Sequence, residues 1–242
     1  MKIISYRLNN ATSYGVLVNN ELYSLPENQS GLPATMNAFL ALEESGMEMA
    51  RQTAKQIEAG TLVAKPISNY EILAPVPHPT SCRDGYAFRQ HVEAARKNRG
   101  VEMIPEFDQY PIFYFTNHQA VEGPGPVYCM PDHFEQLDFE LEIAIVIGKK
   151  GRNIKASEAD AYIAGFTIMN DMSARKLQME EMLLNLGPAK GKDFSTVIGP
   201  WLVTPDELAQ KVAPTKAGHV GLNYNLEMKC YVNDILVSSG NV

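Results

Sequence analysis

Two glutamates in an apolar segment, Glu140 and Glu142, are the residues of this sequence best suited to chemistry. Apolar residues alternate with them over 137–147, which predicts a β-strand with two different faces. Both carboxylates then lie on one face, with their α-carbons roughly 7 Å apart. Like charges held so close in a partly buried place repel, so either one carboxyl is protonated or a cation compensates them. Oxygen ligands of this kind favour Mg²⁺, Ca²⁺ or Mn²⁺. The alternative to a metal site is that both glutamates are ordinary exposed residues of a strand.

Two aspartates could complete such a metal site. Asp171 ends a second apolar segment, 165–171, where an acid at the end of a strand can face the same centre. Asp84 stands directly before Gly85. Taken alone, Asp171 is as readily the N-cap of a following helix, and Asp84 is as readily a turn residue. The metal hypothesis therefore depends on the combination of acids.

Groups that could move protons or bind anions accompany these acids. His91 follows Asp84 by seven residues, about two turns of a helix, and could act on a nearby water as general base. A surface histidine is the simpler alternative. Arg175 and Gln178 are spaced i, i+3 on an expected helix and so share one face. Lys192 stands in a glycine-punctuated loop, where backbone can approach a ligand closely and a lysine can meet an anion.

The elements that must position these residues follow from apolar periodicity and turn residues. We expect a small β-meander over 1–25 with a hairpin tip at Asn19-Asn20. One or two helices follow over 35–59, interrupted near Gly46 and stopped by Gly60. A run of prolines after residue 70 marks a domain boundary. The later segments predict a short helix within 81–100, strands over 112–116, 137–147 and 166–171, a helix over 174–186, and a hairpin around Asn233-Asp234.

Composition narrows the classes of function. The chain has 242 residues, 45% of them hydrophobic and 20% charged, as in ordinary globular proteins, and its formal net charge of −7 disfavours nucleic acid as a partner. Its three cysteines lack CxxC spacing, which argues against a disulfide framework or a thiolate zinc site. The amino terminus lacks a signal-peptide core, and no apolar run approaches the roughly 20 residues that span a bilayer. We therefore expect a cytoplasmic protein without a membrane partner.

Four sequence blocks resemble those of a known family. RDGYAFRQHV, LDFELEIAIVIGK, GFTIMNDMSARKLQ and GPAKGKDFSTVIGPWLVTPDEL occur in this order and are similar to the signature blocks of the fumarylacetoacetate hydrolase family over about residues 70–242. The resemblance implies an α+β protein, with a mixed, barrel-like β-roll catalytic domain over 71–242 behind a small α/β domain over 1–70. It also implies a homodimer with Mg²⁺ or Ca²⁺ in the mouth of the sheet. Relatives continue past the position of Val242, so the resemblance implies a catalytic domain that lacks its C-terminal part.

The resemblance also implies roles for individual residues. The positions that match metal ligands are Asp84, Glu140, Glu142 and Asp171, and the position that matches the general base of the hydrolases is His91. Those that match catalytic groups stabilising a developing enolate are Lys192 and Gln178, and those that match substrate contacts are Arg175 and Tyr114. Thr116-Asn117 stands where many relatives carry Lys-Pro, so one substrate contact is expected to differ.

These roles imply a small-molecule dioxo or 2-oxo acid as the substrate. Our main hypothesis is a metal-dependent hydrolase that cleaves a C–C bond in a β-diketo or acylpyruvate-type acid, as in the catabolism of aromatic compounds. The alternative enzyme is a 2-oxo acid decarboxylase or keto–enol isomerase, which could use the same metal and enolate chemistry without hydrolytic water. The non-enzymatic alternative is a truncated metal-binding remnant.

Overall fold

The computed structural model describes residues 1–98 and 100–242, and its centre is a mixed sheet. Nine strands form this sheet, seven of them in the order β3-β2-β1-β11-β9-β10-β7, with β4 paired to β1 and β8 paired to β9. Neighbouring strands of this sheet are antiparallel, except that β10 runs parallel to β7. The strands are β1 (Lys2–Leu8), β2 (Ala11–Val18), β3 (Glu21–Ser24), β4 (Glu71–Ile72), β7 (Val121–Glu122), β8 (Leu137–Ile147), β9 (Ile163–Ala174), β10 (Thr196–Ile198) and β11 (Leu202–Val203).

Three two-stranded sheets complete the β-structure. They are β5 (Cys82–Gly85) with β6 (Phe113–Thr116), β12 (Val212–Ala213) with β13 (Asn223–Tyr224), and β14 (Glu227–Val232) with β15 (Ile235–Asn241). The helices are α1 (Leu25–Asn28), α2 (Met36–Leu40), α3 (Glu43–Glu58), α4 (Arg89–Asn98) and α5 (Arg175–Met182). Short 3-10 turns lie at η1 (Pro105–Asp108), η2 (Pro131–Gln136), η3 (Ala156–Tyr162) and η4 (Pro205–Lys211). The expected α+β class with mixed sheets is confirmed, but the sheets of residues 1–98 and 100–242 stay open and the expected barrel is not found among them.

The first seventy residues follow the expected pattern with one correction. Asn19 and Asn20 adopt φ values of 51° and 65° between β2 and β3, as a tight hairpin turn of this type requires. The helical segment breaks before Glu43 rather than near Gly46, which lies inside α3. A Cβ at Gly46 would lie 2.9 Å from the Cβ of Leu42, so this glycine permits close packing and does not interrupt the helix.

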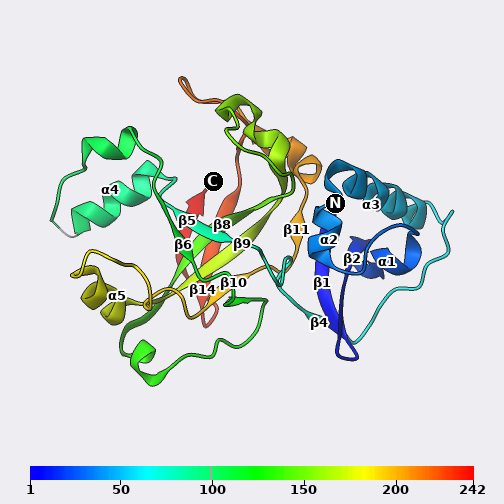
Figure 1. Cartoon of the computed structure of the whole chain (residues 1–242), viewed down its shortest axis with the longest axis horizontal. Helices are drawn as coiled ribbons and strands as arrows, with labels where there is room; N and C mark the ends of the chain where they lie inside the picture. Colours follow the sequence, from blue (N-terminus) through cyan, green and yellow to red (C-terminus); the bar gives the residue numbers. More distant parts are fainter. Residues whose placement is uncertain (99) are drawn as a thin grey trace.

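The amino-terminal meander is joined to the rest of the sheet through backbone pairing. Lys2 pairs with Val203 of β11, while the other edge of β1 pairs with β2. Helices α1–α3 lie beside the meander at one end of the molecule, coloured blue in Figure 1. The main buried cluster, which includes Tyr14 and Phe39, lies between these helices and the strands. The division of the chain at residue 70 stays a prediction.

Strands β8 and β9 form the longest ladder and carry the acidic residues. Glu140 pairs with Asp171 and Glu142 pairs with Met169, so two acids face each other across the ladder. The expected strand over 137–147 is confirmed, whereas the strand expected over 166–171 extends from Ile163 to Ala174. Helix α5 ends at Met182, earlier than expected, because the next residues form a turn that closes at Asn185 with φ 56°.

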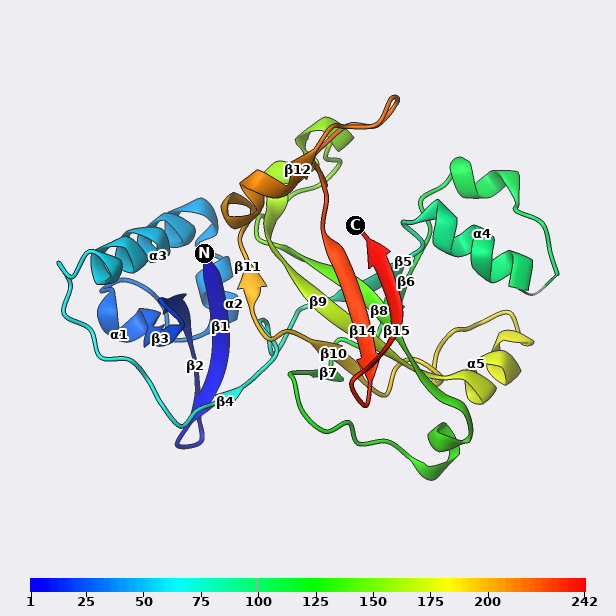
Figure 2. The same cartoon turned by 180° about the vertical axis from the view of Figure 1, so that it is seen from behind.

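The structure confirms two further expected elements, one near the end of the chain and one after residue 81. The hairpin around Asn233-Asp234 is confirmed, with φ values of 49° and 65° at its tip, and Figure 2 shows it crossing one face of the β8–β9 ladder. The short helix expected within 81–100 is confirmed as α4, and strand β5 precedes it; Arg99 in that range lies outside the described residues. No helix in the described part of the chain is both long enough and apolar enough to cross a membrane.

Candidate active site

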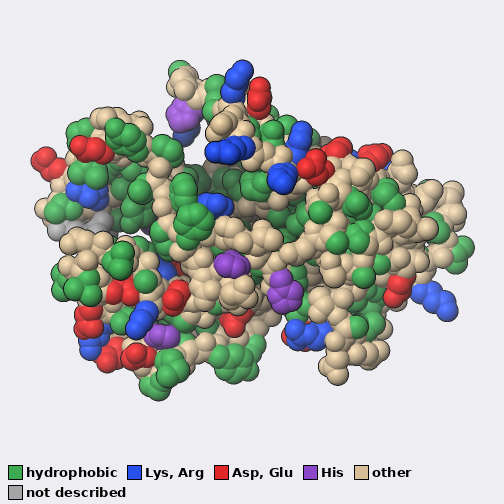
Figure 3. Space-filling view, in the orientation of Figure 1, with side chains coloured by type: hydrophobic (Ala, Val, Ile, Leu, Met, Phe, Trp, Pro, Cys, Tyr) green, Lys and Arg blue, Asp and Glu red, His purple; other side chains and the backbone are tan. Residues whose placement is uncertain are grey.

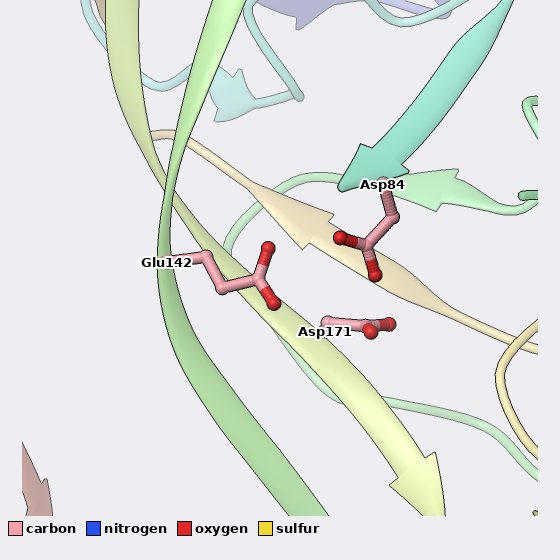
Figure 4. Close-up of side chains that lie close together, drawn as sticks. All are labelled: Asp84, Glu142 and Asp171. Atoms are coloured by element: carbon pink, nitrogen blue, oxygen red, sulfur yellow. The ribbon is translucent and has the colours of Figure 1, made fainter. Parts of the chain in front are cut away.

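Three carboxylates converge from three strands. Asp84 comes from β5, Glu142 from β8 and Asp171 from β9, and one oxygen of each lies within 4.8 Å of the others. Figure 4 shows the three side chains pointing toward one another. Asp171 is buried, with 2% of its surface exposed, while the other two are partly buried. The strands, rather than loops, therefore hold a compact acidic group, which we call the carboxylate triad.

The electrostatics of the triad fit a divalent cation. Burial, with repulsion from Asp84 and Asp171, raises the pKa of Glu142 to about 9. Burial also raises the pKa of Asp171 to about 6, although Lys192 opposes that shift. A cation among these oxygens would remove the repulsion, and three carboxylates form the hard donor set that Mg²⁺, Mn²⁺ and Ca²⁺ prefer. The residues present therefore fit a divalent metal ion.

Glu140 lies beside the triad but has different partners. Its Oε1 accepts a hydrogen bond of 2.6 Å from Arg175 Nη1 and lies 3.2 Å from Lys192 Nζ. Burial acts to raise the pKa of Glu140, but Lys192 and Arg175 outweigh it and hold that pKa below its ordinary value. The structure thus brings together three of the four acids expected as ligands and gives the fourth a cationic environment.

Lys192 is the cation closest to the triad among the ion pairs of the described residues. It is 3% exposed, and its Nζ donates to Asp171 Oδ2 at 2.5 Å. Gly191, just before it, packs so tightly on α5 that a Cβ there would lie 2.7 Å from the Cα of Gln178. The glycine-punctuated loop expected to let backbone approach closely does so against a helix, and its lysine points into the acidic site.

Helix α5 presents Arg175 and Gln178 on one face, as their spacing predicts. Arg175 Nη1 donates to Gln178 Oε1 at 3.2 Å, and Arg175 Nε donates to Asp138 at 2.8 Å. The guanidinium therefore links α5 to two acids of strand β8, at positions 138 and 140. This arrangement holds the start of the helix against the ladder that carries the triad.

Tyr114 reaches the triad from strand β6. It pairs with Asp84 across the β5–β6 ladder, and its hydroxyl donates to Asp84 Oδ2 at 2.8 Å. Burial, with the nearby acids, raises the pKa of Tyr114, so the phenol keeps its proton. Tyr114 also lines an open cleft of about 760 Å³, together with Phe115, Asn117, Leu186 and Asp193 among others. The cleft therefore borders the site at Tyr114.

Among the described residues, His91 has no hydrogen bond or ion pair with the triad or with the other expected site residues. It is exposed near the start of α4, and no imidazole belongs to the acidic group found among the described residues. Because Asp84 lies on a strand and not on the same helix, the two-turn spacing to His91 does not place both on one side. Its role as general base stays a prediction.

One residue that sequence reasoning missed also contacts this region. Glu181, on α5, accepts hydrogen bonds from the backbone of the loop that carries Lys192. The sequence held one indication of this contact: Glu181 follows Gln178 by three residues and so neighbours it on the helix surface.

The comparisons with known proteins agree with this fold. The structure defines the class of this protein: it is an α+β protein whose mixed sheet holds an acidic group suited to a divalent cation. The family model described as "Fumarylacetoacetate (FAA) hydrolase C-terminal" matches residues 80–242. The chain therefore belongs to the fumarylacetoacetate hydrolase family.

Similar proteins include members with different activities. Human mitochondrial oxaloacetate tautomerase FAHD2A is 35% identical over 218 residues, which are 87% of this chain and 60% of that protein. The chain thus spans about three fifths of the length of the curated relatives that it matches. A fumarylacetoacetate hydrolase from Exiguobacterium antarcticum superposes with a TM-score of 0.68 at 23% identity, covering 100% of this chain and 75% of the other. A Sphingobium maleylpyruvate hydrolase, solved with manganese(II) and pyruvate, gives 0.66 at 19% identity, covering 100% and 76%. At these identities the two structures show a shared fold.

Proposed function

We propose that this protein is a metal-dependent keto–enol tautomerase of a small 2-oxo acid, with oxaloacetate as the first substrate to test. The observation that carries the proposal is the buried Lys192 ammonium beside the carboxylate triad, while the imidazole of His91 lies exposed on α4. The names of the 31–35% identical relatives, which include several oxaloacetate tautomerases, support the same choice.

The residues that would hold the metal are Asp84, Glu142 and Asp171. Mg²⁺ or Mn²⁺ is the best match to three carboxylates, and Ca²⁺ suits the same ligands. Such an ion supplies a Lewis acid that polarises the carbonyl of an oxo acid. The negative charge of the triad would repel an anionic substrate, and a bound cation would offset that repulsion.

Side chains of this chain supply the remaining requirements. A tautomerase must stabilise an enolate and move one proton between carbon and oxygen, but it needs neither water nor a leaving group. Lys192 Nζ is a proton-bearing group next to the triad and, as a cation, stabilises negative charge that develops on the substrate oxygen. Gln178, on the same face of α5 as Arg175, offers an amide donor, while Arg175 is engaged with Glu140. Tyr114 keeps the Asp84 carboxylate oriented.

Hydrolysis of a C–C bond makes a further demand that this arrangement does not meet directly. It needs a base that activates water, and the expected base, His91, is not among the described groups whose ligand atoms lie within 4.8 Å of one another in the triad. C–C hydrolysis and decarboxylation are therefore outcomes that the experiment must separate from tautomerisation.

The test is an assay of the purified chain with oxaloacetate and with an acylpyruvate, with Mg²⁺ or Mn²⁺ and after chelation. We expect the ultraviolet absorbance of enol-oxaloacetate to decay faster than the metal-only control, without release of pyruvate or CO₂ beyond that control. Glu142→Gln should abolish the difference, whereas Glu158→Gln, an exposed acid on η3, should leave it intact. Metal-dependent cleavage of the acylpyruvate, with no tautomerisation, would show that the hydrolase hypothesis is correct instead.

We also propose that the protein acts as a homodimer. Large apolar side chains remain exposed on strand β8 and on the β14–β15 hairpin, among them Ile145, Ile147 and Leu236, with 51%, 62% and 50% of their surface accessible. Figure 3 shows hydrophobic side chains exposed at several places on one face of the molecule. Light scattering on a sizing column checks this, since a mass of one chain at micromolar concentration would contradict it.

A further inference from the structure

Glu181 makes an unusual set of contacts with the loop that follows α5. Its Oε1 accepts hydrogen bonds from the backbone N–H of Ala189 at 2.6 Å and of Gly191 at 3.1 Å. Its Oε2 accepts one from the backbone N–H of Lys190 at 2.8 Å. Three consecutive amides thus converge on one carboxylate, an arrangement of backbone N–H groups that binds anions. Hydrogen bonds to a charged acceptor are also stronger than those to a neutral one.

The position of Glu181 is unfavourable for the helix itself. Helix α5 runs from Arg175 to Met182, so that Glu181 lies in the last turn, where the helix dipole favours cations over anions. None of the residues in that turn is basic. The carboxylate is therefore stabilised by the loop amides rather than by its own helix, and this links the two segments.

The loop in question carries Lys192 into the triad. Beyond the amides bound by Glu181, Gly191 C=O accepts a hydrogen bond of 2.8 Å from the backbone N–H of Ala174, at the end of β9. The backbone N–H groups of Lys192 and Asp193 both donate to the C=O of Ala189, which closes a tight turn. A loop with glycines at 187 and 191 is costly to order, so contacts outside it must fix its conformation.

We propose that Glu181 is a positioning residue for Lys192. Its carboxylate holds residues 189–191 in the one conformation that directs the next side chain, Lys192, to Asp171 and Glu140. The same loop forms one wall of the open cleft, through residues 187–189 and 193. This inference rests on the proposed function only where activity is the readout, because the exposure of Lys192 can be measured without substrate.

The first experiment measures how fast Lys192 reacts with an amine-acylating reagent in the metal-free full chain, followed by mass spectrometry. In the native protein Lys192 is protected because its side chain is buried and paired. Glu181→Ala should increase the rate of labelling by about tenfold or more and should increase amide hydrogen exchange over 187–193. Glu181→Gln, which keeps an acceptor oxygen but no charge, should fall between the two. Glu180→Ala, the adjacent exposed acid, is the matched control and should match the native protein.

Chemical rescue provides a second, independent readout. Acetate added to Glu181→Ala supplies a carboxylate for the emptied amides, and we expect it to restore protection of Lys192 in a concentration-dependent way. With oxaloacetate as substrate, Glu181→Ala should lower kcat/KM by about 10²-fold, mainly through kcat, while the Kd for Mn²⁺ changes by less than about threefold.

The outcomes separate the inference from the proposed function. Labelling of Lys192 in Glu181→Ala and Glu181→Gln at the native rate would overturn the inference, as would faster labelling that acetate does not reverse. Faster labelling of Lys192 in Glu181→Ala that acetate reverses would support the positioning role. If the native protein then turned over no oxo acid, the positioning role would stand and the tautomerase proposal would be rejected. If Glu181→Ala fails to fold, the labelling rate of Lys192 in Glu181→Gln decides instead. A native rate would overturn the positioning role, and a faster rate would support it.

Discussion

The raised pKa of Glu142 predicts that the metal-free protein becomes less stable as pH rises. Burial and its acidic neighbours place this pKa at about 9, against an ordinary value of 4.5. Between these values the folded state keeps the proton that the unfolded chain has released, so unfolding becomes more favourable with increasing pH. Each pH unit costs about 1.4 kcal/mol, hence about 3 kcal/mol between pH 6 and pH 8. For a chain of this size that corresponds to a fall in Tm of roughly 6 to 12 °C.

The assay is thermal unfolding in chelator at a series of pH values, repeated with saturating Mg²⁺ or Mn²⁺. Glu142→Gln should remove most of the slope because an amide has no proton to release, and it should make the metal-free protein more stable than wild type at pH 8. The same substitution should weaken metal binding by about 100-fold or more, since it removes a charged ligand. Bound metal should flatten the slope in the wild type.

The refuting result is a Tm of the metal-free protein that is equal at pH 6 and pH 8. An equal slope in Glu142→Gln would assign the effect to other groups and refute the reasoning as well. Asp171, with a pKa of about 6, has largely ionised by pH 7 and adds little above it. Glu158→Gln is the control for removing one negative charge from an exposed position.

Three further substitutions test the remaining contacts. Lys192→Met should destabilise the metal-free protein by about 3 kcal/mol in denaturant titrations, because it leaves Asp171 buried without its cation, and added metal should recover part of the loss. An unchanged midpoint would mean that this ion pair contributes nothing. Tyr114→Phe removes the hydrogen bond to Asp84 and should lower the free energy of unfolding by about 1.5 kcal/mol. This loss should be the same at low and at high salt concentration. His91→Ala should change Tm by only about 1 to 2 °C and should leave oxaloacetate tautomerisation within about threefold of wild type, since the side chain is exposed. A loss of activity above about 10²-fold would return this histidine to the role of general base.

Local rules were sufficient for part of this protein. Side-chain alternation along 137–147 predicts that Glu140 and Glu142 share a face, and the β8 strand confirms it. The Asn19-Asn20 and Asn233-Asp234 pairs predict their hairpins because these residue types tolerate positive φ, which both turns require. The i, i+3 spacing likewise places Arg175 beside Gln178. Each of these conclusions depends on residues close together in sequence.

Local rules could not predict that Glu140 and Glu142 have different partners. Alternation puts them on the same face and the register of β8 on β9 sets Glu140 opposite Asp171, yet it is Glu142 whose carboxylate converges with Asp171 and with Asp84 of β5. Glu140 instead contacts Arg175, at the start of α5, and Lys192, in the loop that follows this helix. These partners come from segments tens of residues apart, and no local pattern specifies which of them will face a given carboxylate.

The sequence by itself thus determined the family, the acidic character of the site and the strands that carry it, because residue types and short-range periodicity encode these properties. Only the tertiary structure decided which acids converge, that Lys192 is buried among them, and that Glu181 holds the loop behind it. It also placed His91 at an exposed position on α4, while Asp84 lies on strand β5. The physical reason is that packing and strand register join residues whose separation in the chain is far longer than any helical or strand period.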